Sequence, residues 1–115
     1  MPLSIATWNI NSVRLRIDLV AAFLEAERPD ILCLQEIKCI EANFPAAAFR
    51  KLGYHHQIVH GQKGYHGVAT VSRVPIREHV RRGFCGKDDA RHVAVSLEAG
   101  GLPLTLHNFY VPAGG

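Results

Sequence analysis

The chain has 115 residues, the ordinary size of one small domain, so two separate domains are not expected. Its 48% hydrophobic and 20% charged residues are typical of soluble globular proteins, and no run of about eighteen apolar residues is available to span a membrane. The formal net charge is +3, and the whole excess lies in residues 61–115, which hold seven Lys/Arg against four Asp/Glu. A basic surface of this size suits a polyanionic partner, although many domains that bind no nucleic acid have one.

The cysteines indicate a reducing compartment. Cys33, Cys39 and Cys85 are odd in number and form no Cys-x-x-Cys pair, which disfavours both a disulfide framework and a zinc site. The first residues also lack the basic and then apolar stretch of a secretory signal. We therefore expect a cytoplasmic location and no membrane partner.

The first predicted elements are a buried strand over residues 3–9 and a helix over 13–27. Residues 11–12, Asn-Ser, are a good helix start because either side chain can accept a hydrogen bond from the amides of the first turn. Apolar residues then recur at spacings of three and four, which gives the helix one apolar stripe. We expect Pro29 to end the helix and to hold Arg28 in an extended conformation.

The next segment completes a βαβ unit. Residues 31–34, Ile-Leu-Cys-Leu, form an apolar run that is too short for a helix and typical of a strand buried on both faces. Two such strands joined by a helix predict parallel neighbours in a sheet. A short helix over 45–52 follows. Five strands come next, at 54–59, 68–72, 77–81, 92–97 and 104–111, and a hairpin turn at 99–101 joins the last two.

The arrangement of the later strands carries a prediction about solubility. We expect the strands of residues 54–111 to form one sheet with its outer face covered by the helix over 13–27. The opposite face would then be largely bare, and an apolar face of that extent exceeds what soluble monomers usually expose. The isolated chain is therefore predicted to self-associate.

Three short polar stretches follow predicted strands, at residues 8–11, 34–38 and 108–112. Sites in α/β folds gather at such strand ends. Glu36 is the most informative residue, because a carboxylate at the end of a buried strand is costly unless it is paired or bound to a cation. A surface ion pair with Lys38 or Arg14 is the simplest alternative.

Asn9 ends the neighbouring strand, so its amide oxygen could converge with the carboxylate of Glu36. Oxygen ligands of this kind suit Mg²⁺, which keeps several waters and uses one or two carboxylates. Asn9 could equally serve as a cap or turn residue.

The glycine-rich stretch 61–67 is a third candidate for function. Its glycines permit close approach to a backbone, Lys63 supplies positive charge, and Tyr65 offers a flat ring face. An ordinary hairpin loop would have the same composition. The seven histidines show no spacing typical of zinc ligands, so a zinc site is not expected.

Four stretches, taken in order, strongly resemble the exodeoxyribonuclease III family of the endonuclease/exonuclease/phosphatase superfamily. The Leu-Gln-Glu-x-Lys and Gly-Gln-Lys-Gly patterns within them point to the DNA-repair branch, away from the sphingomyelinase and inositol-phosphatase branches. The resemblance extends from about Leu3 to the end of the chain. The stretches are 8–14 (Trp-Asn-Ile-Asn-Ser-Val-Arg), 29–38 (Pro-Asp-Ile-Leu-Cys-Leu-Gln-Glu-Ile-Lys), 61–69 (Gly-Gln-Lys-Gly-Tyr-His-Gly-Val-Ala) and 110–112 (Tyr-Val-Pro).

The resemblance implies an α/β fold. Residues 1–115 would form the N-terminal portion of one domain, the first half of a four-layer α-β-β-α sandwich in which a mixed sheet carries a covering helix. The site would lie at the rim between two sheets. The resemblance also implies activities: cleavage of duplex DNA 5′ to abasic sites, 3′→5′ exodeoxyribonuclease action, and removal of 3′ blocking groups.

The same resemblance assigns roles to individual residues. It implies that Glu36 binds Mg²⁺ directly, with Mn²⁺ as a possible substitute, and that Asn9 orients the metal or a phosphate oxygen. Tyr110 would lie beside the scissile phosphate, as a catalytic residue together with Asn9. Arg14 and Tyr65 would contact the DNA backbone. The positive charge of Lys63 in the glycine-rich stretch makes it a third candidate for DNA binding.

The chain departs from the family pattern in three places. Ile37 and Ala113 replace a usual Thr and a usual Asn or Gln. The later family motifs, Gly-Asp-x-Asn and Ser-Asp-His, have no counterpart within the 115 residues. We therefore expect that the C-terminal portion is absent and that the chain alone is inactive. A non-catalytic DNA- or metal-binding remnant, and a sister phosphodiesterase acting on RNA or small phosphoesters, remain alternatives.

Overall fold

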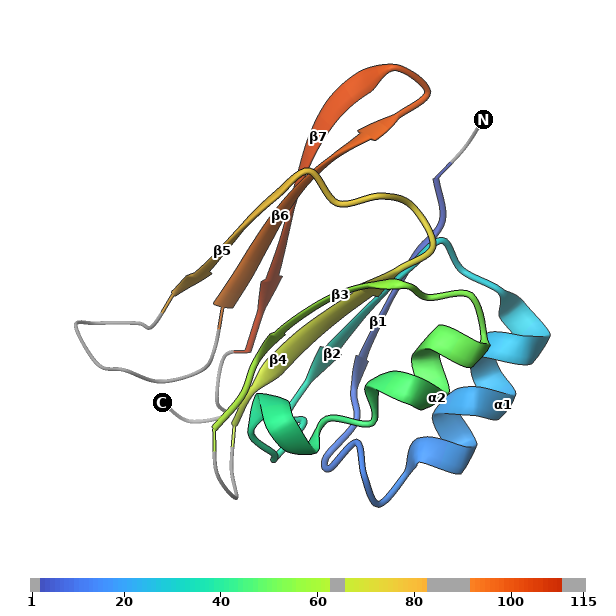
Figure 1. The fold of residues 1–115 in the computed structure, drawn as a ribbon, viewed down its shortest axis with the longest axis vertical. Helices are drawn as coiled ribbons and strands as arrows, with labels where there is room; N and C mark the ends of the chain where they lie inside the picture. Colours follow the sequence, from blue (N-terminus) through green and yellow to red (C-terminus); the bar gives the residue numbers. More distant parts are fainter. Residues whose placement is uncertain (1–2, 63–65, 83–91, 111–115) are drawn as a thin grey trace.

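The computed structural model describes residues 3–62, 66–82 and 92–110, which form two stacked sheets with helices on one side (Figure 1). The first sheet has the strand order β1-β2-β4-β3 and the second β5-β6-β7. The strands are β1 Ile5–Asn9, β2 Ile31–Gln35, β3 His56–His60, β4 Val68–Ser72, β5 Glu78–Arg82, β6 His92–Ala99 and β7 Leu102–Phe109. The helices are α1 Ile17–Glu27, the short 3₁₀ helix η1 Glu41–Asn43 and α2 Ala46–Lys51.

The predicted βαβ unit is confirmed. Strands β1 and β2 run parallel, with Trp8 opposite Leu34, and α1 makes the crossover between them. Strand β4 pairs antiparallel with both β2 and β3, so the sheet is mixed, as expected. Strand β2 is buried on both faces: Leu34 packs into the core beneath the helices, and Cys33 packs toward the second sheet. Strand β1 was predicted to be buried, but it is the edge strand and Ile5 is 44% exposed.

The predicted start of the first helix is wrong by one turn. Helix α1 begins at Ile17, whereas Asn11 and Ser12 have positive φ angles of 48° and 84° and lie in a loop. The amide of Ser12 donates to the carbonyl of Glu36 at 2.8 Å, so this segment is tied to the end of β2 instead of opening a helix. Arg28 was expected to be extended, but it is left-handed (φ 48°, ψ 48°) because its amide closes the helix on the carbonyl of Leu24.

The prediction of one sheet over residues 54–111 is also wrong. After β4 the chain crosses to a second layer, where β5, β6 and β7 form a separate antiparallel sheet. Apolar side chains of both sheets fill the space between them, so the face that the sequence suggested would be bare is covered. Those that are buried are Ile31, Cys33, Val68, Val93, Val95 and Leu97. Self-association of the chain stays a prediction, but this face no longer supports it.

The helices cover the other face of the first sheet (Figure 1). Val20 and Leu24 of α1 and Phe49 of α2 are fully buried there. Neither these helices nor any other within the described ranges is long and apolar enough to cross a membrane.

Candidate active site

Three loops meet at the ends of strands in the first sheet, at the lower end of the molecule in Figure 1. The loop after β1 is joined to the loop after β2 by the amide of Val13, which donates to the carbonyl of Ile37 at 3.1 Å. The amide of Ile37 in turn donates to the carbonyl of Gly67 at 3.1 Å, at the start of β4. Backbone hydrogen bonds thus continue beyond the strands and hold the loops in a common arrangement.

Two glycines of the β3–β4 connection permit this close approach. A Cβ atom on Gly67, whose φ is +90°, would lie 2.6 Å from Cγ1 of Ile37. A Cβ on Gly61 would lie 2.4 Å from the carbonyl oxygen of Cys39. Both distances are far inside van der Waals contact, so only glycine fits. The sequence predicted that these glycines serve close approach, and the backbone they approach is the protein's own loop after β2.

Glu36 leaves β2 with a positive φ of 53° and is half-buried. Its Oε1 accepts a hydrogen bond from the hydroxyl of Tyr110 at 3.1 Å. Within the described part of the chain Glu36 makes no ion pair. Lys38, one of its two proposed partners, donates instead to Oδ1 of Asn11. The simple alternative of a surface ion pair is therefore not what the structure shows.

Tyr110 brings the second sheet into the site. It directly follows β7, and its ring lies 5.5 Å from the ring of His66, at an interplanar angle of 41°. The Glu36–Tyr110 hydrogen bond therefore joins residues from the two sheets at their common rim. His66 was not among the predicted site residues, although it lies in the same glycine-rich stretch as Lys63 and Tyr65.

Two neutral amides beneath this pair were also missed. Nε2 of Gln35 donates to Oδ1 of Asn108 at 2.8 Å, which links β2 to β7. Nδ2 of Asn108 donates to the carbonyl of Ala69 in β4 at 2.9 Å. Asn108 is only 2% exposed. A polar residue at an inward position of an apolar strand was the signal that could have revealed it.

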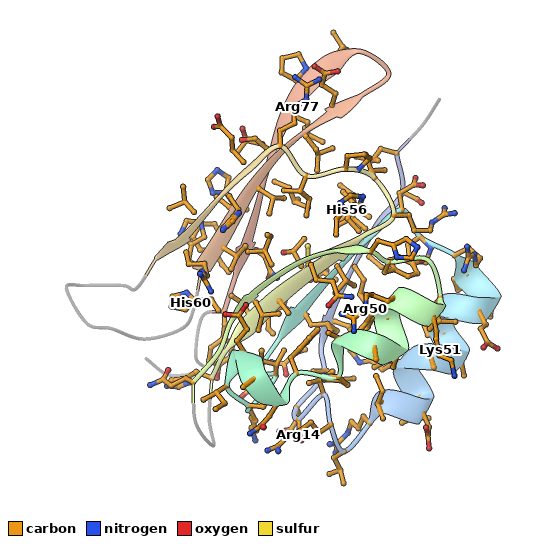
Figure 2. All side chains as sticks on the ribbon, viewed as in Figure 1. Arg14, Arg50, Lys51, His56, His60 and Arg77 are labelled. Atoms are coloured by element: carbon orange, nitrogen blue, oxygen red, sulfur yellow. The ribbon has the colours of Figure 1, made fainter. Side chains whose placement is uncertain are left out.

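The remaining predicted residues differ in what the structure shows of them. Asn9 lies opposite Gln35 in the parallel pairing, next to Glu36 along the rim, but its side chain contacts neither Glu36 nor another polar group of the described residues through a hydrogen bond. Arg14 is exposed on the connection between β1 and α1 (Figure 2). Lys63 and Tyr65 lie outside the described residues.

The charge of Arg14 reaches the loop after β2. Burial raises the pKa of the Cys39 thiol, and the nearby guanidinium of Arg14 partly opposes that rise. Arg14 thus lies close enough to the loop that carries Glu36 to act on it electrostatically. A cation at this rim is suited to holding a phosphate backbone.

Few side chains at the described rim could hold a metal ion. No group of three or more His, Cys, Asp or Glu side chains that could hold a metal occurs in residues 3–62, 66–82 and 92–110. One carboxylate, Glu36, stands at the rim with the amide of Asn9 on the adjacent strand end. Mg²⁺ is commonly bound by one or two carboxylates while it keeps several waters, so this sparse set of oxygens is compatible with it.

The model of the endonuclease/exonuclease/phosphatase family matches residues 6–113 of the sequence. The chain belongs to that family. The match includes the three joined loops and both members of the Glu36–Tyr110 pair. The resemblance noted in the sequence is thereby confirmed.

Curated proteins with sequence similarity include an exodeoxyribonuclease and a recombination repair protein. The chain is 39% identical over 111 residues to exodeoxyribonuclease III of Haemophilus influenzae, covering 94% of this chain and 41% of that protein. It is 36% identical over 116 residues to recombination repair protein 1 of Drosophila melanogaster, covering 98% of this chain and 16% of that protein. The chain thus spans less than half the length of these relatives.

Solved structures of similar proteins confirm the fold class. An AP endonuclease from Archaeoglobus fulgidus matches with a TM-score of 0.82 and 35% identity, over 98% of this chain and 42% of that one. The 3′ phosphatase NExo from Neisseria, bound to a product DNA hairpin, matches with a TM-score of 0.79 and 35% identity, over 90% of this chain and 40% of that one. The layers seen here therefore correspond to part of an α/β endonuclease/exonuclease/phosphatase fold.

Proposed function

We propose that the protein is a magnesium-dependent DNA-repair phosphodiesterase that cleaves duplex DNA 5′ to abasic sites, acts as a 3′→5′ exodeoxyribonuclease, or does both. Family membership and the names of the similar proteins support a nuclease of this kind. The observation that carries the proposal is the state of Glu36. It is a half-buried carboxylate at a strand end that receives one neutral hydrogen bond and, within the described residues, no cation.

Such a carboxylate is suited to a metal. Desolvation of an unpaired carboxylate is costly, and a bound cation removes that cost. Mg²⁺, when bound, would neutralise charge on the phosphate and polarise a water molecule. Glu36 would hold the ion with the amide oxygen of Asn9 nearby, and the hydroxyl of Tyr110 would orient the Glu36 carboxylate toward it.

The DNA would be held without reading its sequence. Arg14 is exposed near the rim, and Lys63 and Tyr65 belong to the connection whose end at His66 and Gly67 is hydrogen-bonded to the loop after β2. Arginine and lysine side chains that contact phosphates position a duplex but carry no sequence information, as an enzyme that searches for damage requires. An abasic nucleotide has no base to unstack, so its extrusion costs less than that of an intact one.

We include in the proposal that the 115 residues alone do not cleave DNA. The described part of the site offers the carboxylate of Glu36, the phenol of Tyr110 and the amides of Asn9, Gln35 and Asn108. Phosphoryl transfer also needs a group that positions the attacking water. The proposed roles of these residues are to bind the metal and to orient its ligands, so the attacking water is left without such a group. A remnant that binds DNA or metal without cleaving remains the alternative for the isolated chain.

A single assay tests the activity and its metal requirement. A labelled duplex with one abasic site is incubated with the complete protein and, separately, with residues 1–115, in Mg²⁺, Mn²⁺ or EDTA. We expect the complete protein to cleave in either metal and not in EDTA, and the 115-residue chain to be inactive. An undamaged duplex serves as the control that isolates 3′→5′ degradation. Cleavage that persists in EDTA, or a complete protein that leaves both substrates intact, would overturn the proposal.

A cytoplasmic location is a further part of the proposal. Cys33 and Cys39 are free and buried thiols, and burial raises the pKa of Cys33 to about 11 while the hydroxyl of Thr70 partly opposes that rise. Unpaired thiols are usual in a reducing compartment. Cell fractionation followed by detection of the protein would test the location.

A further inference from the structure

We propose that Asn108 is a positioning residue that sets Tyr110 against Glu36 across the two sheets. The inference rests on the proposed function of the Glu36 site. It adds a residue of β7 that acts on this site from between the two sheets. Asn108 is 2% exposed, although the buried cluster between the sheets is otherwise built from apolar side chains. A buried amide is retained at low cost only where its hydrogen bonds are made, so the bonds of Asn108 show what it does.

Asn108 contacts both inner strands of the first sheet. Its Nδ2 donates to the carbonyl of Ala69 at 2.9 Å and lies 3.3 Å from both the carbonyl of Leu34 and the hydroxyl of Thr70. Its Oδ1 accepts from Nε2 of Gln35 at 2.8 Å. One side chain of β7 is thus bonded to β2 and to β4.

These partners determine which way the amide faces. Carbonyl oxygens only accept, so Nδ2 must point toward Ala69 and Leu34. Oδ1 then faces Gln35, whose own Nε2 lies 3.0 Å from the hydroxyl of Thr7 in β1. The result is a chain of side-chain hydrogen bonds that runs from β1 through β2 to β7.

This series of hydrogen bonds lies next to the Glu36–Tyr110 pair in the sequence and in the fold. Asn108 is buried between the sheets, and Tyr110, which directly follows β7, packs against the apolar cluster between them. Gln35 immediately precedes Glu36. The Gln35–Asn108 bond therefore connects the residue directly before Glu36 to the residue two positions before Tyr110.

Apolar packing alone would not provide this alignment. Apolar side chains such as Val93 and Val95 fill the space between the sheets, and apolar attraction is not directional. The hydrogen bonds of Arg81 with the carbonyl of Val59 and of His60 with the carbonyl of His92 join β3 to β5 and β6, not to β7. Hydrogen bonds from one amide to two strands specify both the spacing and the offset of β7 over the first sheet. Asn108 is for this reason expected to decide where the Tyr110 hydroxyl lies.

The test is a double-mutant cycle in the complete protein. Asn108→Leu, which keeps the volume and removes the hydrogen bonds, should lower kcat about tenfold and leave KM within about twofold, because positioning and not DNA contact is lost. In a Tyr110→Phe background the same substitution should change kcat by less than about twofold, since the bond that it aligns is already gone.

Gln57→Leu is the matched control. Gln57 is a half-buried amide that, like Asn108, donates to backbone carbonyls, here those of Ala46 and Tyr54 on the helix side of the first sheet. The Gln57→Leu substitution should reduce the free energy of unfolding about as much as Asn108→Leu does and should leave kcat unchanged. An unchanged kcat in folded Asn108→Leu, or an equal loss in both backgrounds, would refute the positioning role. If Asn108→Leu does not fold, Gln35→Met, which removes the other partner of the same hydrogen bond, is measured in the same cycle. An unchanged kcat, or an equal loss in both backgrounds, would again refute the positioning role.

A structural measurement separates this inference from the proposed function. If the wild-type protein cleaves nothing, the proposed function fails, and nuclear Overhauser contacts between the rings of Tyr110 and His66 still test the position of Tyr110. We expect these contacts to be lost in Asn108→Leu and kept in Gln57→Leu. Contacts that survive unchanged in Asn108→Leu would overturn the inference.

Discussion

Two carboxylates stand at opposite ends of β2, and their surroundings differ. Asp30 precedes the strand and Glu36 follows it. Asp30 accepts hydrogen bonds from the amide of Ser4 at 2.9 Å and from its hydroxyl at 3.2 Å, and forms an ion pair with Arg73 at 3.0 Å. Among the described residues, the carboxylate of Glu36 accepts one hydrogen bond, from the Tyr110 hydroxyl.

The pKa of Asp30 reflects its partners. The amide of Ser4 is the largest cause of a lowered pKa, and the Ser4 hydroxyl and the Arg73 charge act in the same direction against the effect of burial. Asp30 is therefore satisfied by the protein itself, as a structural carboxylate must be. Glu36 has no such set of partners among the described residues, which is the arrangement expected of a carboxylate kept for an external cation.

The sharpest test of this comparison is to remove each charge in turn. Glu36→Gln in the complete protein should lower Mg²⁺-supported cleavage by roughly 100-fold or more, because a metal ion contributes several kcal/mol to the transition state. Asp30→Asn should leave cleavage within about twofold when the protein is folded. Rates at saturating Mg²⁺ measure both. Unchanged activity in Glu36→Gln would mean that Glu36 is not the metal ligand.

A smaller effect is expected from the one hydrogen bond that Glu36 accepts. Tyr110→Phe should lower kcat about tenfold, the loss that corresponds to about 1.4 kcal/mol of alignment from a hydrogen bond to a charged group. Stability should change little, since the phenol is only half-buried. Kinetics and urea unfolding on the same preparation check both points. A loss as large as that of Glu36→Gln would indicate that Tyr110 acts on the phosphate directly.

The charge of the glycine-rich connection should matter less still. Lys63→Ala should weaken DNA binding a few-fold and equally for all sequences, and should make the slope of log K against log salt shallower by about 0.9. Fluorescence anisotropy at several salt concentrations measures the slope. A loss confined to particular base contexts would show that this segment reads bases.

The smallest effect concerns Asp30. Because its pKa in the folded protein is lowered, its contribution to stability is present above the ordinary value near 3.8 and is lost as the pH falls through the lowered value. Asp30→Asn should therefore reduce the free energy of unfolding by about 1 kcal/mol at pH 7 and by progressively less below about pH 4. Urea unfolding of both proteins at pH 7 and at pH 2 tests this. A difference that persists at pH 2 would show that lost packing, not charge, is responsible.

Much of the first sheet could be predicted from local pattern. The apolar run at 31–34 indicated a strand buried on both faces, and β2 is one. Periodicity placed the first helix but not its start, because a good capping residue, Ser12, is used in a hydrogen bond to the carbonyl of Glu36. A contact between residues so far apart in sequence has no local signal.

The site was predicted in part for the same reason. Glu36 and Tyr110 each carried a signal of their own, a polar residue directly after an apolar strand. Asn108 carried only the weaker signal of a polar residue at an inward strand position, and the partners of Asn108 and His66 depend on a second sheet that the strand pattern did not separate from the first. Alternation along a strand shows which residues face inward, but not which sheet they face.

The sequence by itself determined the type and order of most elements, the family, and the carboxylate on which the proposed site depends. These follow from short-range periodicity and from residues at strand ends, which are properties of neighbouring positions. Only the tertiary structure decided that β5 to β7 leave the first sheet, that Glu36 meets Tyr110 rather than Lys38, and that Asn108 links β2 and β4 to β7. Each of these is a choice among partners distant in the chain, made by the burial of apolar faces and the satisfaction of buried polar groups in the whole fold.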